Sequence, residues 1–240
     1  MASEWEKSWN PEDIKGRIEK LREAFLAAKE YKKRLGVDGR GWKKNGDLRF
    51  RVFNHIINTI IVADISSHHT LAMIRDDFWK KQKHLTDKDK RMMTEEYDRA
   101  NFRTFFFEIF ISIEFFFRAA LKAVDPSACK EATANFKCVY DTLLGKTSYH
   151  YHLPDVLNLY RTMRNGLHNN FIHTGDDDTL SYKGVDYEFK KGQPIEHFGW
   201  GLIIDMTITI TQSLGELVQS MPIVAVPSIP DPYDNFYLTS

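Results

Sequence analysis

The sequence has few cysteines and no net charge, and each shortage narrows the range of functions. Only Cys129 and Cys138 are present in 240 residues. They are too few for a disulfide framework and lack the paired spacing of a zinc site. Two thiols and a polar start, with no secretory signal, fit the reducing cytosol, so we expect a cytoplasmic protein. Lys+Arg and Asp+Glu both number 33, so any RNA contact must come from a local basic patch.

Long hydrophobic runs are also missing. The most apolar run, residues 105–117, is interrupted by Glu108 and Glu114 and is too short to span a bilayer. We therefore expect no membrane anchor. The composition, with 42% hydrophobic and 28% charged residues, is typical of a soluble globular protein that is long enough to bury a core.

Apolar residues recur at helical spacing through most of the chain. This spacing predicts helices over residues 11–35, 47–80, 86–124, 127–144, 153–174 and 198–221. Two short alternating runs predict a β-hairpin over residues 179–195. A Thr-Ile-Thr-Ile-Thr run at residues 207–211 also has strand propensity. The simplest fold is mainly α, an up-and-down helical bundle with a small β-hairpin insertion near residues 179–195.

The domain organisation follows from the same pattern. Residues 1–221 are expected to form a single helical bundle domain. Four prolines in the last 19 residues predict an extended, Pro-containing tail over residues 222–240. They are Pro222, Pro227, Pro230 and Pro232.

The helix predicted over residues 153–174 carries the strongest candidate site. Arg161, Arg164, Asn165 and His168 stand at i, i+3, i+4 and i+7, a spacing that places them along one helix face. An apolar stripe lies beside them, so the helix packs by one side and presents polar groups on another.

These residues resemble the signature of the HEPN superfamily (higher eukaryote and prokaryote nucleotide-binding domains), an Arg followed after four to six residues by a His. Arg161 and His168 are separated by six residues and fit that spacing. Arg164-Asn165 supplies the Arg-polar pair of the signature, but only three residues separate Arg164 from His168. The resemblance covers the motif and its helical context, with a core of about residues 47–221.

The resemblance implies a helical bundle that forms a homodimer and binds RNA or nucleotide. In active members it implies a nuclease, a metal-independent endoribonuclease that needs no cofactor. An imidazole can move a proton near neutral pH, and a guanidinium can hold a phosphate. His168 would be the acid/base, Arg164 and Arg161 would clamp phosphate, and Asn165 would orient either group. Substrate contacts would come from Asn169, Asn170 and His173.

Two alternatives remain open for this helix. It can be a structural helix end, with His168 capping the C-terminus and Asn169 or Asn170 in a left-handed turn. The protein would then be a non-catalytic helical module that binds a protein partner. Arg161 and Arg164 would in that case be buried in ion pairs.

Glu108 and Glu114 lie in an apolar run and therefore need partners. We expect them to pair with Arg161 or Arg164 and so to support the site. A di-iron centre is excluded because no histidine follows a glutamate at the required Glu-x-x-His spacing, and we expect no metal site. Arg49 and Arg51, with nearby aromatic residues, form either a basic-aromatic strip for RNA or, as we favour, a polar loop.

Overall fold

The computed structural model describes residues 10–37, 41–42, 46–75, 77–129, 135–147, 153–196 and 199–231. The order of elements is α1 (Pro11–Val37), α2 (Leu48–Met73), α3 (Asp87–Val124), α4 (Phe136–Thr147), α5 (Leu153–His168), β1 (Asp178–Tyr182), β2 (Val185–Phe189), α6 (Trp200–Leu217) and α7 (Met221–Val224). The mainly α fold with a small β-hairpin is confirmed.

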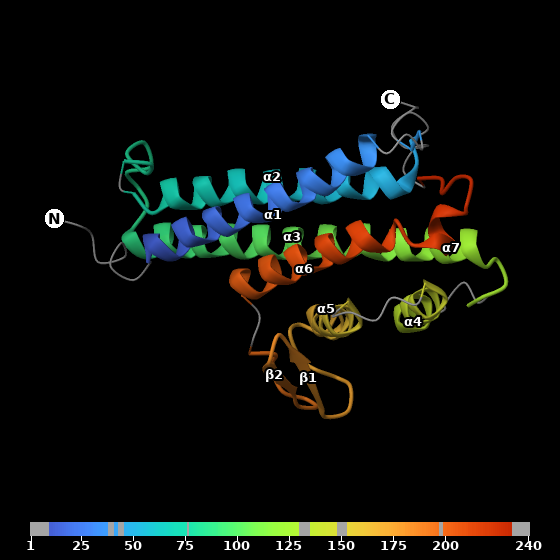
Figure 1. Ribbon diagram of the computed structural model, residues 1–240. Helices are drawn as coiled ribbons and strands as arrows, with labels where there is room; N and C mark the ends of the chain where they lie inside the picture. Colours follow the sequence, from blue (N-terminus) through green and yellow to red (C-terminus); the bar gives the residue numbers. More distant parts are fainter. Residues whose placement is uncertain are drawn as a thin grey trace.

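The long helices are arranged in layers (Figure 1). The helices α1, α2 and α3 lie roughly parallel in the picture and alternate in direction, and α6 packs mainly against α1. The shorter α4 and α5 are seen end-on below them, so they cross the long helices at a steep angle. The hairpin hangs beneath α5. The helix α5, which carries the candidate residues, thus lies between the layer of long helices and the hairpin, next to α4.

Local signals set the helix starts. The Asn10 side chain accepts a hydrogen bond from the Glu12 amide at 3.1 Å, and Thr86 and Asp89 form a capping box at the start of α3. Both caps satisfy amide groups that have no partner within the helix.

The Thr-Ile-Thr-Ile-Thr run lies within α6 and is helical. The hydroxyls of Thr207 and Thr211 donate to the carbonyls four residues earlier, each at 2.7 Å. Burial of Ile203, Ile210 and Leu214 in the bundle core outweighs the strand propensity of the β-branched residues.

The aromatic half of α3 lies at the centre of the core. Phe105, Phe106, Phe116 and Phe117 are almost completely buried. The ring of Phe106 stacks on that of Tyr160 in α5, with centroids 4.7 Å apart. This contact fixes α5 against the central helix.

The extended tail predicted from residue 222 is wrong for its first ten residues, 222–231. Residues Met221–Val224 form α7, and Ile229 is buried. The Leu48 amide donates to the Ile229 carbonyl at 2.9 Å. Pro222 lies in the first turn of α7, a position that tolerates proline, and the segment that follows packs on α2. The rest of the predicted tail lies outside the described residues.

The expectation of two free thiols is also wrong, because Cys129 and Cys138 form a disulfide. It joins the loop after α3 to the first turn of α4. The positive φ of 47° at Cys129 turns the chain so that the two side chains meet. Sequence spacing alone did not indicate this turn.

Candidate functional site

The C-terminal end of α5 is closed by a tight turn. Asn170 and Phe171 have φ values of 55° and 66°, and the Phe171 amide donates to the Gly166 carbonyl at 2.8 Å. This pattern is typical of a Schellman motif, in which a left-handed residue follows the helix. The left-handed turn expected at Asn169 or Asn170 is therefore at Asn170. The Asn169 side chain makes a different contact, since its Nδ2 donates to the Asn165 backbone carbonyl at 2.8 Å.

The structure divides the four polar residues of α5 between two surroundings. Arg161 and Asn165 line a cavity of about 400 Å³ with His173 and the acidic segment 176–178. Arg164 and His168 do not line it and instead contact aromatic rings of α3. One helix face therefore serves two neighbouring surfaces.

The cavity beside Arg161 is poorly suited to phosphate. The three aspartates at its rim oppose an anion. Among the described residues, Lys190 and Lys191 alone lie close enough to pair with Asp177 and Asp176. His173 is buried, and its Nε2 lies 2.8 Å from the Asp176 carbonyl oxygen. We infer that His173 orders this loop.

Arg161 also faces α4. Burial raises the pKa of Tyr140 to about 12, although the nearby positive charge of Arg161 acts in the opposite direction. The Tyr140 hydroxyl donates to the Asn158 side chain at 2.5 Å. The Nε of Arg161 is buried and has no hydrogen-bond partner among the described residues. Arg161 is thus largely enclosed by α4 and the loop.

The buried tyrosines predict a loss of stability at alkaline pH. Burial raises the pKa of Tyr140, Tyr160 and Tyr182 in the folded state. For Tyr140 the stabilising contribution is complete below the ordinary pKa of 10.0 and is lost as the pH rises from there through about 12. For Tyr160 and Tyr182, whose pKa values are raised further, it is lost at still higher pH. We expect the urea midpoint to fall between about pH 9 and about pH 11. Tyr140→Phe should show a smaller fall, and equal falls in both proteins would contradict the assignment to Tyr140.

A second surface lies between α3 and α5, and we call it the α3–α5 face. Three contacts run along it. The Arg103 guanidinium lies over the Phe171 ring at 5.1 Å, the His168 ring is 5.4 Å from that of Phe107, and the Arg164 guanidinium is over Phe110 at 5.5 Å. In the order of the α3 residues 103, 107 and 110, the partners are Phe171, His168 and Arg164, so the contact of His168 comes between those of the two arginines.

The three polar groups of the α3–α5 face are accessible. Arg103 and His168 are exposed, and Arg164 is partly exposed. None of the three forms an ion pair with a carboxylate within the described ranges. The aromatic rings beneath them hold the two cations in place. This face can bind an anion and bring an imidazole to it.

The sequence analysis did not identify Arg103. Its signal is the i, i+4, i+7 spacing of Arg103, Phe107 and Phe110 on α3, which places an arginine on the same face as two of the rings. The dense run of phenylalanines masks this spacing, because residues of every helix face in it are aromatic.

The role expected for Glu108 and Glu114 is wrong. Glu114 pairs with Arg118 on its own helix, at 2.5 Å. Glu108 is exposed and lines a cavity between α2 and α3. Both glutamates point away from the buried face of α3, so neither needs an arginine of α5.

Gly166 lets the chain after the hairpin pack on α5. A Cβ atom at this position would overlap the Ile195 side chain. We expect Gly166→Ala to destabilise the protein by about 1–3 kcal/mol, because Ile195 must move. Gly145→Ala in α4 is the matched control, since a Cβ there meets nothing within 4 Å. It should stabilise by up to about 1 kcal/mol. Urea unfolding checks both, and equal effects would contradict the packing argument.

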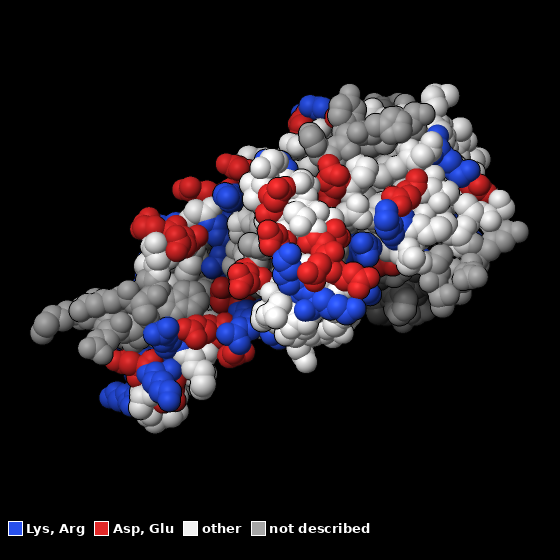
Figure 2. Space-filling view, turned by 90° about the horizontal axis from the view of Figure 1, so that it is seen from below, with Lys and Arg blue, Asp and Glu red and all other residues white. Residues whose placement is uncertain are grey.

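Acidic and basic side chains are mixed on the underside of the molecule (Figure 2). This view has no large area of one sign. An RNA ligand would therefore be held by a few placed cations and not by a general basic field.

Comparison with protein-family models, curated proteins and solved structures found no match for the chain. The HEPN resemblance therefore stays a prediction that rests on the residues of α5. No helix in the described segments has the length and apolar character needed to cross a membrane. No cluster of His, Cys, Asp or Glu within the same segments could hold a metal ion. The histidines at 150 and 152 lie outside the described residues.

Proposed function

We propose that the protein is a HEPN-like RNA-binding protein and a metal-independent endoribonuclease. The observation that carries this proposal is the α3–α5 face, where an accessible imidazole and two arginines contact successive aromatic rings. Arg103 and Arg164 would hold a phosphodiester from both sides, and His168 would transfer a proton to or from the ribose or the leaving oxygen. Arg161 and His173 would support the helix end and the loop.

The accessibility of these groups favours the nuclease over the interaction module. A purely structural helix end would bury Arg164 and His168 in ion pairs, whereas in the described residues they contact only rings and the Asn165 side chain. Cations kept on a surface without carboxylates are available to phosphate.

The chemistry also favours a homodimer. Attack of a ribose 2′-OH on the adjacent phosphate needs one group to take a proton and another to give one. Each protomer offers His168 on this face, while His173 is buried. A second copy would supply the second imidazole, in agreement with the paired motifs that the resemblance implies.

Incubation of the purified protein with a mixed-sequence, single-stranded RNA in EDTA tests the proposal. We expect cleavage that leaves 2′,3′-cyclic phosphate ends, and no cleavage of the same sequence as DNA, because DNA lacks the 2′-OH. Cleavage that is lost in EDTA would contradict the proposal. RNA binding without cleavage would reduce it to a binding function, and no binding would favour the protein-interaction module.

A further inference from the structure

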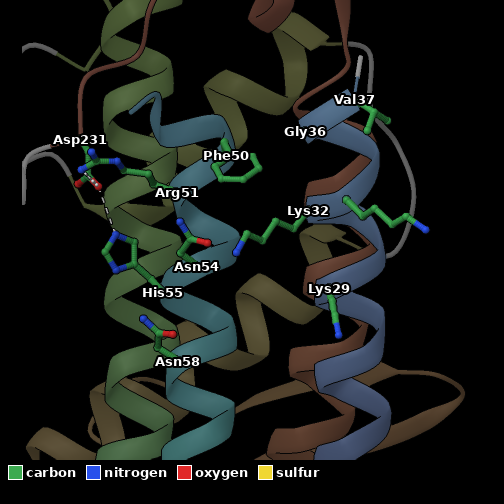
Figure 3. Close-up of a pocket in the computed structure, with 11 residues that line it drawn as sticks. Lys29, Lys32, Gly36, Val37, Phe50, Arg51, Asn54, His55, Asn58 and Asp231 are labelled. Atoms are coloured by element: carbon green, nitrogen blue, oxygen red, sulfur yellow. Dashed lines mark hydrogen bonds and ion pairs between the residues drawn. The ribbon is translucent and has the colours of Figure 1, made fainter. Parts of the chain in front are cut away.

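A separate cavity of about 790 Å³ opens between α1 and α2 (Figure 3). No residue of α5 lines it. Its walls come from α1, α2 and Asp231 near the end of the described chain. The volume is within the range of small-molecule sites.

Basic groups dominate the lining of this cavity. Lys29, Lys32 and Lys33 come from one side of α1, and Arg51 and His55 come from α2. Among the described residues that line the cavity, Asp231 is the single carboxylate. Four permanent cations therefore face one anion, a balance that favours a ligand with more than one negative charge.

The lone carboxylate orders the α2 side of the cavity. The Asp231 side chain is 1% exposed, and its Oδ2 lies 3.3 Å from His55 Nε2 and 3.5 Å from Arg51 Nη1. Its carboxylate thus already contacts the Arg51 guanidinium and the His55 imidazole. Asp231 positions these groups without neutralising the lysines.

The lysines of α1 have no such partner. None of the three pairs with a carboxylate in the described part of the chain. Lys32 lies over the Phe50 ring at 5.5 Å and extends across the cavity toward Asn54 (Figure 3). Asn54 and Asn58, one turn apart on α2, add amide groups that can donate to oxygen.

We propose that this cavity binds a small molecule that carries two or more phosphate groups. Lysine ammonium groups bind phosphate oxygens as point charges, and the asparagine amides would fix the orientation. The Phe50 ring, which is almost fully buried, forms part of the wall, and the lysine and arginine charges give the cavity its preference for phosphate. The site is independent of the nuclease proposed on the α3–α5 face.

Calorimetric titration with inorganic triphosphate tests the proposal. We expect binding to the unmodified protein, and weaker binding of orthophosphate. Lys29→Gln combined with Lys32→Gln should weaken triphosphate binding by about tenfold or more, because charged hydrogen bonds are lost. Lys15→Gln combined with Lys20→Gln is the matched control, since these residues lie on α1 outside the cavity. It should bind within about twofold of the unmodified protein.

A second measurement titrates the unmodified protein and follows its histidine resonances by NMR. The imidazole resonances of His55 should shift when triphosphate is added to the unmodified protein, with His55 assigned by difference. Three results would each overturn the proposal. They are absence of triphosphate binding, equal weakening of that binding by the two pairs of lysine substitutions, and a His55 resonance that does not shift. Orthophosphate that binds as tightly as triphosphate would overturn the requirement for more than one phosphate.

Discussion

His168→Ala is expected to reduce metal-independent RNA cleavage by about 100- to 10,000-fold, the usual contribution of a general acid or base. The imidazole is exposed and contacts the Phe107 ring, so its removal should cost less than about 1 kcal/mol of stability. Initial cleavage rates in EDTA, with circular dichroism and urea unfolding of both proteins, measure the two effects separately.

His84→Ala is the matched control, because His84 is exposed in the segment between α2 and α3 and lines none of the surfaces discussed for α5. It should cleave at the unmodified rate. Arg103→Ala and Arg164→Ala should each weaken RNA binding as well as cleavage, since each removes a phosphate contact. A folded His168→Ala protein that cleaves at the normal rate would contradict the assignment of the active site.

Arg49→Ala should destabilise the fold by about 3–5 kcal/mol, the largest effect on stability that we predict. Arg49 is fully buried, and all five of its N–H groups are engaged. Two bond to Asp47, at 2.8 and 2.6 Å. The others reach the carbonyls of Ile223, Val226 and Pro227. Loss of the guanidinium leaves the Asp47 carboxylate and these carbonyls short of donors.

Urea unfolding measures this loss. Arg34→Ala is the control, since Arg34 pairs with Glu30 on the surface, and it should change stability by about 0.5 kcal/mol or less. The double variant Asp47→Asn with Arg49→Met should lose less than the sum of its single variants, because no charge is left alone. Arg49→Ala that behaves like Arg34→Ala would show that the buried network contributes little.

The same network explains why Asp231 can line the α1–α2 cavity. Asp47 Oδ2 accepts from the Ile229 amide at 3.0 Å, which holds the chain two residues before Asp231. The interpretation of Arg49 as part of a basic strip or polar loop is therefore wrong. The prediction failed because the sequence around Arg49 is polar, whereas the carbonyl groups that bind its guanidinium lie more than 170 residues away in the chain.

The sequence by itself determined most of the secondary structure. Repeats of apolar residues at 3.6-residue spacing, the caps at Asn10 and Thr86, and the Lys183-Gly184 turn of the hairpin act over a few residues. Such signals depend on neighbours in the chain. They placed the long helices, the β-hairpin and the polar group of α5 before any packing was known.

Only the tertiary structure decided how the polar residues of α5 are used. Arg161, Arg164, Asn165 and His168 span an arc of about 100° around the helix, which is wide enough to meet two neighbours. Arg161 and Asn165 lie beside the acidic loop, and Arg164 and His168 contact rings of α3. The choice depends on how α5 crosses the bundle, and that angle is set by core packing such as the Phe106–Tyr160 stack. Helical spacing fixes which residues share a face, while the position of each neighbour around that face comes from contacts between segments distant in sequence.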